Sequence, residues 1–255
     1  MKTTVVVAFL VASSLAASAA AQQQSQPAPG ATARPAGAAP PRSPLPPPEP
    51  IEHIKDNVYK IFGGGGNTLV VVQQDGVVLV DTKLPNNGPA ILAEVKKVTD
   101  KPIKLIINTH SHPDHLGSND YLREQYPNVR IVMNAGAKEE LSGPQSNPKL
   151  LPTETYTDHM TIGSGPDQIE LYHFGRGHTN GDTFVVFSAA RVLCMGDVMA
   201  WNMAPFLPAG GAELIAQETE ALVKAVKGKV ELVEEGHGHM DTWADLERLV
   251  RFNRA

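Results

Sequence analysis

Cysteine is almost absent from this 255-residue chain, which contains only Cys194. A single cysteine excludes an intrachain disulfide framework and any metal or iron–sulfur site built from several thiolates. A surplus of basic residues is missing too, because 22 lysines and arginines face 27 aspartates and glutamates and leave a formal net charge of -5. We therefore expect no nucleic-acid partner. The G-x-S-x-G nucleophile motif is also absent.

Long apolar runs are confined to the N-terminus, where Val5 to Leu15 follows Lys2. This run is shorter than the roughly 20 residues that span a bilayer, and three small residues, Ala19–Ala21, follow it. The pattern predicts a signal peptide over residues 1–21, with an uncleaved anchor as the alternative. The protein is then expected to be bacterial, periplasmic or secreted, with no stable membrane span after the signal is removed.

Proline and alanine dominate residues 22–50, which predicts an extended, disordered tether. Residues 51–255 are expected to form a single folded domain, since a chain of this length can bury a sizeable core.

Apolar, β-branched runs and helical spacing alternate along this domain, which predicts a layered α/β fold. The expected strands cover 58–62, 69–73, 77–81, 104–108, 129–133, 168–174, 183–187, 192–195 and 230–233. Helices are expected over 91–98, after Pro113, and over 214–226 and 243–252. Asp75-Gly76 predicts a hairpin. A long surface loop is expected over 142–165, and a mobile loop near the pocket at Gly63–Gly66.

Three of the nine histidines fall within the six residues His110-Ser111-His112-Pro113-Asp114-His115, directly after a predicted apolar strand. In an extended chain residues i and i+2 point the same way, so His110 and His112 can share one metal ion. Pro113 favours a helix start, which turns Asp114 and His115 toward a second ion. The alternative is a histidine-rich surface loop.

Three later segments each put a polar residue beside glycine at the end of a predicted strand. They are Gly177-His178-Thr179, Gly196-Asp197 and Gly236-His237-Gly238. Strand ends hold such side chains on a rigid scaffold, and glycine lets the backbone approach closely. Imidazole and carboxylate suit zinc, and also iron or manganese.

The ordered series HSHPDH, GHT, GD and GHG, with Val80-Asp81-Thr82 before it, resembles the metallo-β-lactamase-fold hydrolases over about residues 58–250. The resemblance implies a four-layer αβ/βα sandwich whose residues 51–255 are the catalytic domain. It implies two metal ions, expected to be zinc, although iron or manganese would suit the same donors. The implied first-ion ligands are His110, His112 and His178, the implied second-ion ligands are Asp114, His115 and His237, and Asp197 would bridge both. Asp114 is also the expected catalytic residue, and Asp81 would orient a ligand. His239 competes with His237 for the last position.

The resulting hypothesis is an exported dinuclear zinc hydrolase whose metal-bound hydroxide opens an amide, lactam, ester or lactone carbonyl of a small molecule. The alternatives are a thioesterase similar to glyoxalase II, an oxidoreductase with one iron that resembles the sulfur dioxygenases, and a zinc-binding module without activity. No oligomeric state is predicted.

Four residues are expected to border the substrate. They are Trp201, Met203, Phe206 and Asn180. Core packing is an equal alternative for the first three. Cys194 is expected to be a buried thiol, and Asp182 to cap a turn.

Overall fold

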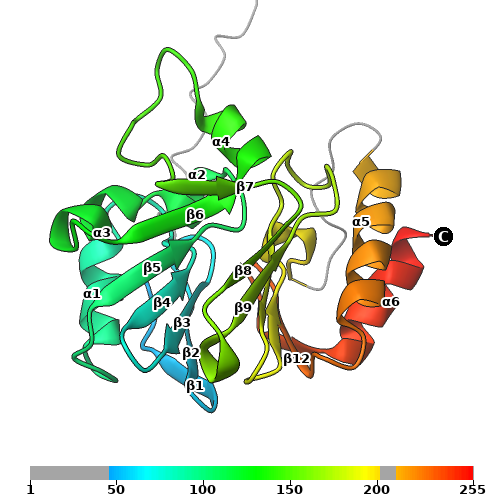
Figure 1. Ribbon diagram of the computed structural model, residues 1–255, viewed down its shortest axis with the longest axis horizontal. Coiled ribbons are helices and arrows are strands. Elements are labelled where there is room, and N and C mark those ends of the chain that lie inside the picture. The colour runs from blue at the N-terminus through cyan, green and yellow to red at the C-terminus, as the bar shows by residue number, and fades with distance from the viewer. Residues whose placement is uncertain (1–45, 202–210, 255) are drawn as a thin grey trace, which may run out of the picture. The chain divides into compact units, whose positions relative to one another are not determined.

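The computed structural model describes residues 46–201 and 211–254, which form two β-sheets and the helices that cover them (Figure 1). Met203 and Phe206, which are expected to border the substrate, lie outside the described residues. So do residues 1–45, which hold the expected signal peptide and most of the expected tether. The helices are α1 (Gly88–Val95), α2 (Pro113–Leu116), α3 (Asn119–Gln125), α4 (Ala135–Leu141), α5 (Gly211–Val226) and α6 (Trp243–Asn253). Among the described residues, no helix has the length and apolar character needed to cross a bilayer.

The first sheet has seven strands in chain order. They are β1 (Glu52–Lys55), β2 (Val58–Ile61), β3 (Thr68–Val72), β4 (Val77–Val80), β5 (Ile103–Ile107), β6 (Arg130–Asn134) and β7 (Glu154–Tyr156). β1 to β4 pair antiparallel, and the β3–β4 hairpin turns at Asp75-Gly76 as predicted. From β4 to β7 the pairing is parallel, so the carboxyl ends of β4 and β5 lie at one edge. That edge carries Asp81 and the histidine run.

The second sheet has six strands in the order β13-β12-β11-β10-β9-β8. They are β8 (His159–Ile162), β9 (Ile169–Tyr172), β10 (Phe184–Phe187), β11 (Val192–Cys194), β12 (Leu232–Glu234) and β13 (Met240–Thr242). Only β11 and β12 pair parallel in this sheet. Their carboxyl ends therefore deliver Gly196-Asp197 and Gly236-His237 to the same edge.

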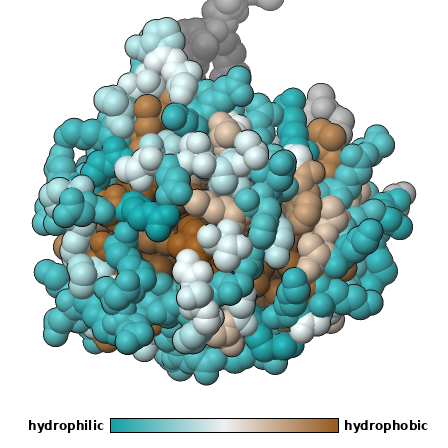
Figure 2. Space-filling model, in the orientation of Figure 1, coloured by the Kyte–Doolittle hydropathy of each residue, from teal (hydrophilic) through white to brown (hydrophobic). Residues whose placement is uncertain are grey.

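Among the described residues, the three larger of four apolar clusters hold the layers together. One lies between the sheets and joins side chains such as Val80 and Ile107 to Val185 of the second sheet. A second packs α1 and α3 against the outer face of the first sheet, and a third packs α5 and α6 against the second. Hydrophilic residues cover most of the face in Figure 2, and hydrophobic ones show in its middle. The expected αβ/βα sandwich is confirmed.

The segment expected to be a single long loop, 142–165, instead contains two strands, β7 and β8. β7 has three residues and lies at the edge of its sheet, and β8 exposes His159 and Thr161. Short edge strands carry little apolar pattern, and prolines and glycines flank these two. The strands β1 and β13 were not predicted either, because they are equally short. The helix α4 was also not predicted.

The glycine loop expected to be mobile is instead buried and hydrogen-bonded. Gly66 N–H donates to Asp114 O at 2.9 Å, and Gly64 N–H donates to Pro46 O at 2.8 Å. Lys83 Nζ donates to Gly66 O at 3.0 Å and to Ile61 O at 2.7 Å. Packing against neighbouring elements, which glycine's small volume permits, therefore restrains this loop.

One buried acid on α5 has no partner. Glu218 is 1% exposed, and among the described residues neither of its carboxyl oxygens meets a hydrogen-bond donor. Burial, followed by repulsion from Asp182, raises the pKa of Glu218 to about 10 from a usual 4.5. The side chain is therefore protonated in the folded protein at neutral pH, whereas in the unfolded chain it is ionised.

This difference predicts a pH-dependent penalty that Glu218→Gln removes. Between pH 4.5 and about 10 the folded state binds the extra proton, so its stability falls as pH rises, and the loss is absent below pH 4.5. At pH 7 we expect the variant to exceed the wild type by about 3 kcal/mol in free energy of unfolding. Urea denaturation from pH 4 to 9 measures this. Glu213→Gln, on an exposed residue of the same helix, is the control. A constant difference across pH would contradict the assignment.

Candidate metal centre

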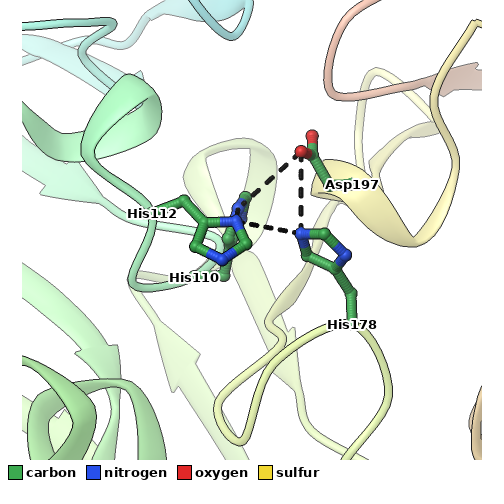
Figure 3. A group of neighbouring side chains, drawn as sticks. All are labelled: His110, His112, His178 and Asp197. Atoms are coloured by element: carbon green, nitrogen blue, oxygen red, sulfur yellow. Dashed lines mark hydrogen bonds and ion pairs between the residues drawn. The ribbon is translucent and has the colours of Figure 1, made fainter. Parts of the chain in front are cut away.

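Four side chains from three segments of the chain point toward one another (Figure 3). They are His110, His112, His178 and Asp197, and their ligand atoms all lie within 4.8 Å of one another. His112 Nδ1 lies 3.1 Å from His110 Nε2 and 3.0 Å from His178 Nε2. The three imidazoles and one carboxylate offer the donor set that zinc takes at a catalytic site.

A second group lies beside the first and consists of Asp114, His115 and His237. Pro113 begins α2 as expected, and the helical turn aims Asp114 and His115 inward. His237 Nε2 lies 3.2 Å from His115 Nε2 and 3.2 Å from Asp114 Oδ2. The two imidazole nitrogens face each other, an arrangement that suits a shared cation.

Asp197 lies between the two groups. Its Oδ1 is 3.2 Å from His115 Nε2, and its Oδ2 is 3.3 Å from His237 Nε2. The same Oδ2 is 3.7 Å from His178 Nε2 and 3.9 Å from His110 Nε2. One carboxylate therefore lies against both sets of imidazoles.

Asp81 supports the centre from behind. Its Oδ2 accepts hydrogen bonds from His115 Nδ1, at 2.7 Å, and from Thr109 Oγ1, at 2.7 Å. Because the Thr109 hydroxyl donates to Asp81, it accepts from His110 Nδ1 at 2.9 Å. Both histidines therefore engage Nδ1 behind the centre, which leaves Nε2 as the nitrogen that would bind a cation. The role of Thr109 was not predicted, because threonine after a strand carries no signal of its own.

The charges at the centre favour a cation. Burial first, and then the neighbouring imidazoles, lower the pKa of His110 far below its usual 6.5, which keeps the ring neutral. Burial alone would lower the pKa of His237 as well, but Asp114 and Asp197 raise it to about 9. Burial would raise the pKa of Asp197, but His115 first, and then His237 and His110, hold it well below its usual range. The centre therefore holds an ionised carboxylate beside imidazoles that its charge keeps protonated, and a bound cation would take the place of those protons.

The competing histidine lies away from the centre. His239 is exposed, and its ring stacks on Phe62 at 5.7 Å between centroids. Trp201 is 53% exposed and stacks on His237 at 4.3 Å between centroids.

The remaining expectations near the centre are met in part. Asn180 is exposed, and Asp182 is buried and accepts from Thr179 N–H and Oγ1, which is the expected turn cap. Cys194 is a buried thiol 2.8 Å from Glu234 Oε2.

The glycine loop also backs the second group, and sequence reasoning missed this. A Cβ on Gly66 would lie 2.3 Å from His115 Cε1, and the ring cannot retreat because Asp81 holds it in a fully buried position. Only glycine leaves space for the imidazole here.

We expect Gly66→Ala to lower the free energy of unfolding by about 1–3 kcal/mol, the usual cost of overpacking. Gly143→Ala is the matched control, because no atom lies within 4 Å of its added Cβ. Chemical denaturation of the two variants and the wild type measures the difference. Equal stability of the two variants would mean that Gly66 does not pack against His115 as described.

A sequence profile of the metallo-β-lactamase superfamily matches residues 61–253. The chain is 25% identical over 213 residues to the type 2 metallo-β-lactamase of Elizabethkingia meningoseptica, covering 76% of this chain and 80% of that protein. It is 34% identical over 115 residues to the hydroxyacylglutathione hydrolase of Prochlorococcus marinus (strain MIT 9312), covering 44% and 43%. The solved metallo-β-lactamase from Pontibacter korlensis shares the fold, with a TM-score of 0.70, 19% identity, and 81% of this chain and 99% of that chain covered. The chain therefore belongs to the metallo-β-lactamase superfamily of metal-dependent hydrolases.

Proposed function

We propose that this protein is an exported dinuclear zinc hydrolase that opens an amide, lactam, ester or lactone carbonyl of a small molecule. The observation that carries the proposal is the contact of one carboxylate, Asp197, with both imidazole groups. Two ions held on either side of Asp197 would be close enough to act on one carbonyl.

The donors of this chain fit zinc. His110, His112 and His178 would hold one ion together with Asp197, and Asp114, His115 and His237 would hold the other. Nitrogen and carboxylate oxygen are its usual ligands, and histidines whose Nδ1 protons are already engaged present Nε2 without rearrangement. When bound, such ions supply a nucleophile at neutral pH by acidifying water, and they polarise the carbonyl.

The chain's own residues would orient the reaction and move its proton. The Asp114 side chain is 30% exposed, more than that of Asp197, so its Oδ2 is the carboxylate oxygen best placed to pass a proton to a leaving group. Trp201 would form an apolar wall beside His237, and Asn180 would lie at the rim. Asp81 and Thr109 would keep His110 and His115 in the tautomer that binds metal. These two residues would therefore position the ligands without touching the substrate.

The alternatives differ in measurable ways. A hydrolase of thioesters is supported by the partial match to hydroxyacylglutathione hydrolase. An oxidoreductase with one iron would leave the second donor group without a function, and a zinc-binding module would hold metal without turnover. Nitrocefin, a homoserine lactone and a glutathione thioester, tested with zinc-loaded protein, separate the three hydrolase substrates.

We expect His112→Ala to lose one of two zinc ions and to reduce turnover more than about 100-fold while the fold survives, because this exposed side chain packs against no core. The control is His239→Ala, which replaces a histidine that lies two residues after His237 and outside the centre. This variant should retain both ions and full activity. Elemental analysis and the hydrolysis panel measure both variants. Full turnover by His112→Ala would contradict the metal mechanism, and one iron per chain would favour the oxidoreductase.

We also propose that residues 1–21 are removed on export and that residues 22–50 remain as a tether to the catalytic domain. Expression in a bacterium that exports proteins should therefore give a mature chain beginning at Gln22 in the periplasm or the medium. Intact-mass measurement of the two fractions checks this. A full-length chain bound to the membrane would support an uncleaved anchor instead.

A further inference from the structure

A cleft of about 490 Å³ lies between the end of α4 and the loop that follows it. Residues 140–147 and Leu150 line it. The loop rises beyond α4 in Figure 1 and is mostly pale or teal in Figure 2. The lining combines apolar leucine and proline with uncharged hydroxyl and amide side chains, and Glu140 is its only charged residue.

Glu140 connects this cleft with the centre. Its carboxylate accepts a hydrogen bond from Ser111 Oγ and another from Asn180 N–H, the latter at 3.0 Å. Ser111 lies between His110 and His112 in the chain, and Asn180 is two residues after His178. The same carboxylate therefore borders both the cleft and the two loops that carry the first imidazole group.

The scaffold around Glu140 is tightly packed. A Cβ on Gly136 would lie 2.2 Å from Asn180 O, and one on Gly181 would lie 2.1 Å from Ala137 N. The start of α4 is thus in direct backbone contact with the turn after His178, so the position of Glu140 relative to the centre is set by the fold.

The carboxylate also has no basic partner. Glu140 is exposed, and within residues 46–201 and 211–254 no lysine or arginine forms an ion pair with it. Two hydrogen bonds leave further lone pairs on its oxygens. A negative charge at the mouth of an uncharged cleft attracts a cation and repels an anion, and charge pairs of this kind discriminate between ligands more than they add affinity.

We propose that this cleft is an accessory subsite that binds the protonated amine end of an extended substrate, with Glu140 as its charge partner. The reacting carbonyl would lie at the metals, and the substrate would reach the cleft past Ser111 and Asn180, which Glu140 contacts. A short uncharged spacer would cover the apolar and amide lining. This inference rests on the proposed function and names its substrate class as cationic carbonyl compounds.

Binding tests the subsite without any need for turnover. Hexylammonium, titrated at millimolar concentration into the isotope-labelled protein, should shift the backbone amide signals of residues 140–147, whereas hexanoate should not. Glu140→Gln should weaken hexylammonium binding at least fivefold. Glu139→Gln removes the neighbouring exposed carboxylate of α4 and should bind as the wild type does. No shift, equal shifts with hexanoate, or an equal effect of the two variants would overturn the proposal.

Kinetics test the same preference on the zinc-loaded protein. The 4-nitrophenyl esters of 6-aminohexanoate, hexanoate and adipate differ only in an ammonium, methyl or carboxylate end. We expect kcat/KM for the ammonium ester to exceed that for the carboxylate ester at least tenfold, and Glu140→Gln to bring this ratio close to one.

A role of Glu140 limited to holding the two loops predicts a different result. Glu140→Gln would then lower metal content and all three rates alike, and this outcome would overturn the subsite. If the wild type binds no zinc and hydrolyses none of the esters, the proposed function fails, and the amide shifts alone decide the subsite.

Discussion

The hydrogen bonds of one buried carboxylate, Asp81, underlie the geometry of the whole centre. Asp81 follows β4, and the Thr109 and His115 groups that donate to it follow the adjacent parallel strand β5. Parallel pairing brings the two strand ends together, and Asp81 then fixes which nitrogen of His110 and His115 faces the centre. A neutral side chain at position 81 would leave the imidazoles free to rotate or to exchange tautomers, and the second group would lose its orientation.

The backbone around the centre is packed so closely that side chains are excluded at several positions. A Cβ on Gly177 would lie 1.7 Å from Glu218 Oε1, and one on Gly236 would lie 1.9 Å from Asp197 Oδ1. Gly196 adopts a φ of +53° before Asp197, with Thr109 directly against it. These contacts explain why the polar residues of the centre lie next to glycine: the backbone turns that carry them pass through spaces with no room for a methyl group.

The sequence was sufficient to predict the layered fold, because apolar runs and helical spacing are local patterns. The convergence of the polar strand ends was predicted from the resemblance to a known family. It could not choose between His237 and His239, which lie two residues apart, and only the stacking of His239 on Phe62, just after the distant strand β2, separates them. The roles of Glu140 and Lys83 could not be predicted from the sequence either. Each depends on a contact with a segment far away in the chain, and neither residue type signals such a contact.

The account as a whole requires two ions that share Asp197. Diffraction data collected at the zinc absorption edge from crystals of the zinc-loaded protein test this most directly. We expect two anomalous peaks about 3.5–4 Å apart, one beside His110, His112 and His178 and the other beside Asp114, His115 and His237. A single peak, or peaks remote from Asp197, would contradict the account.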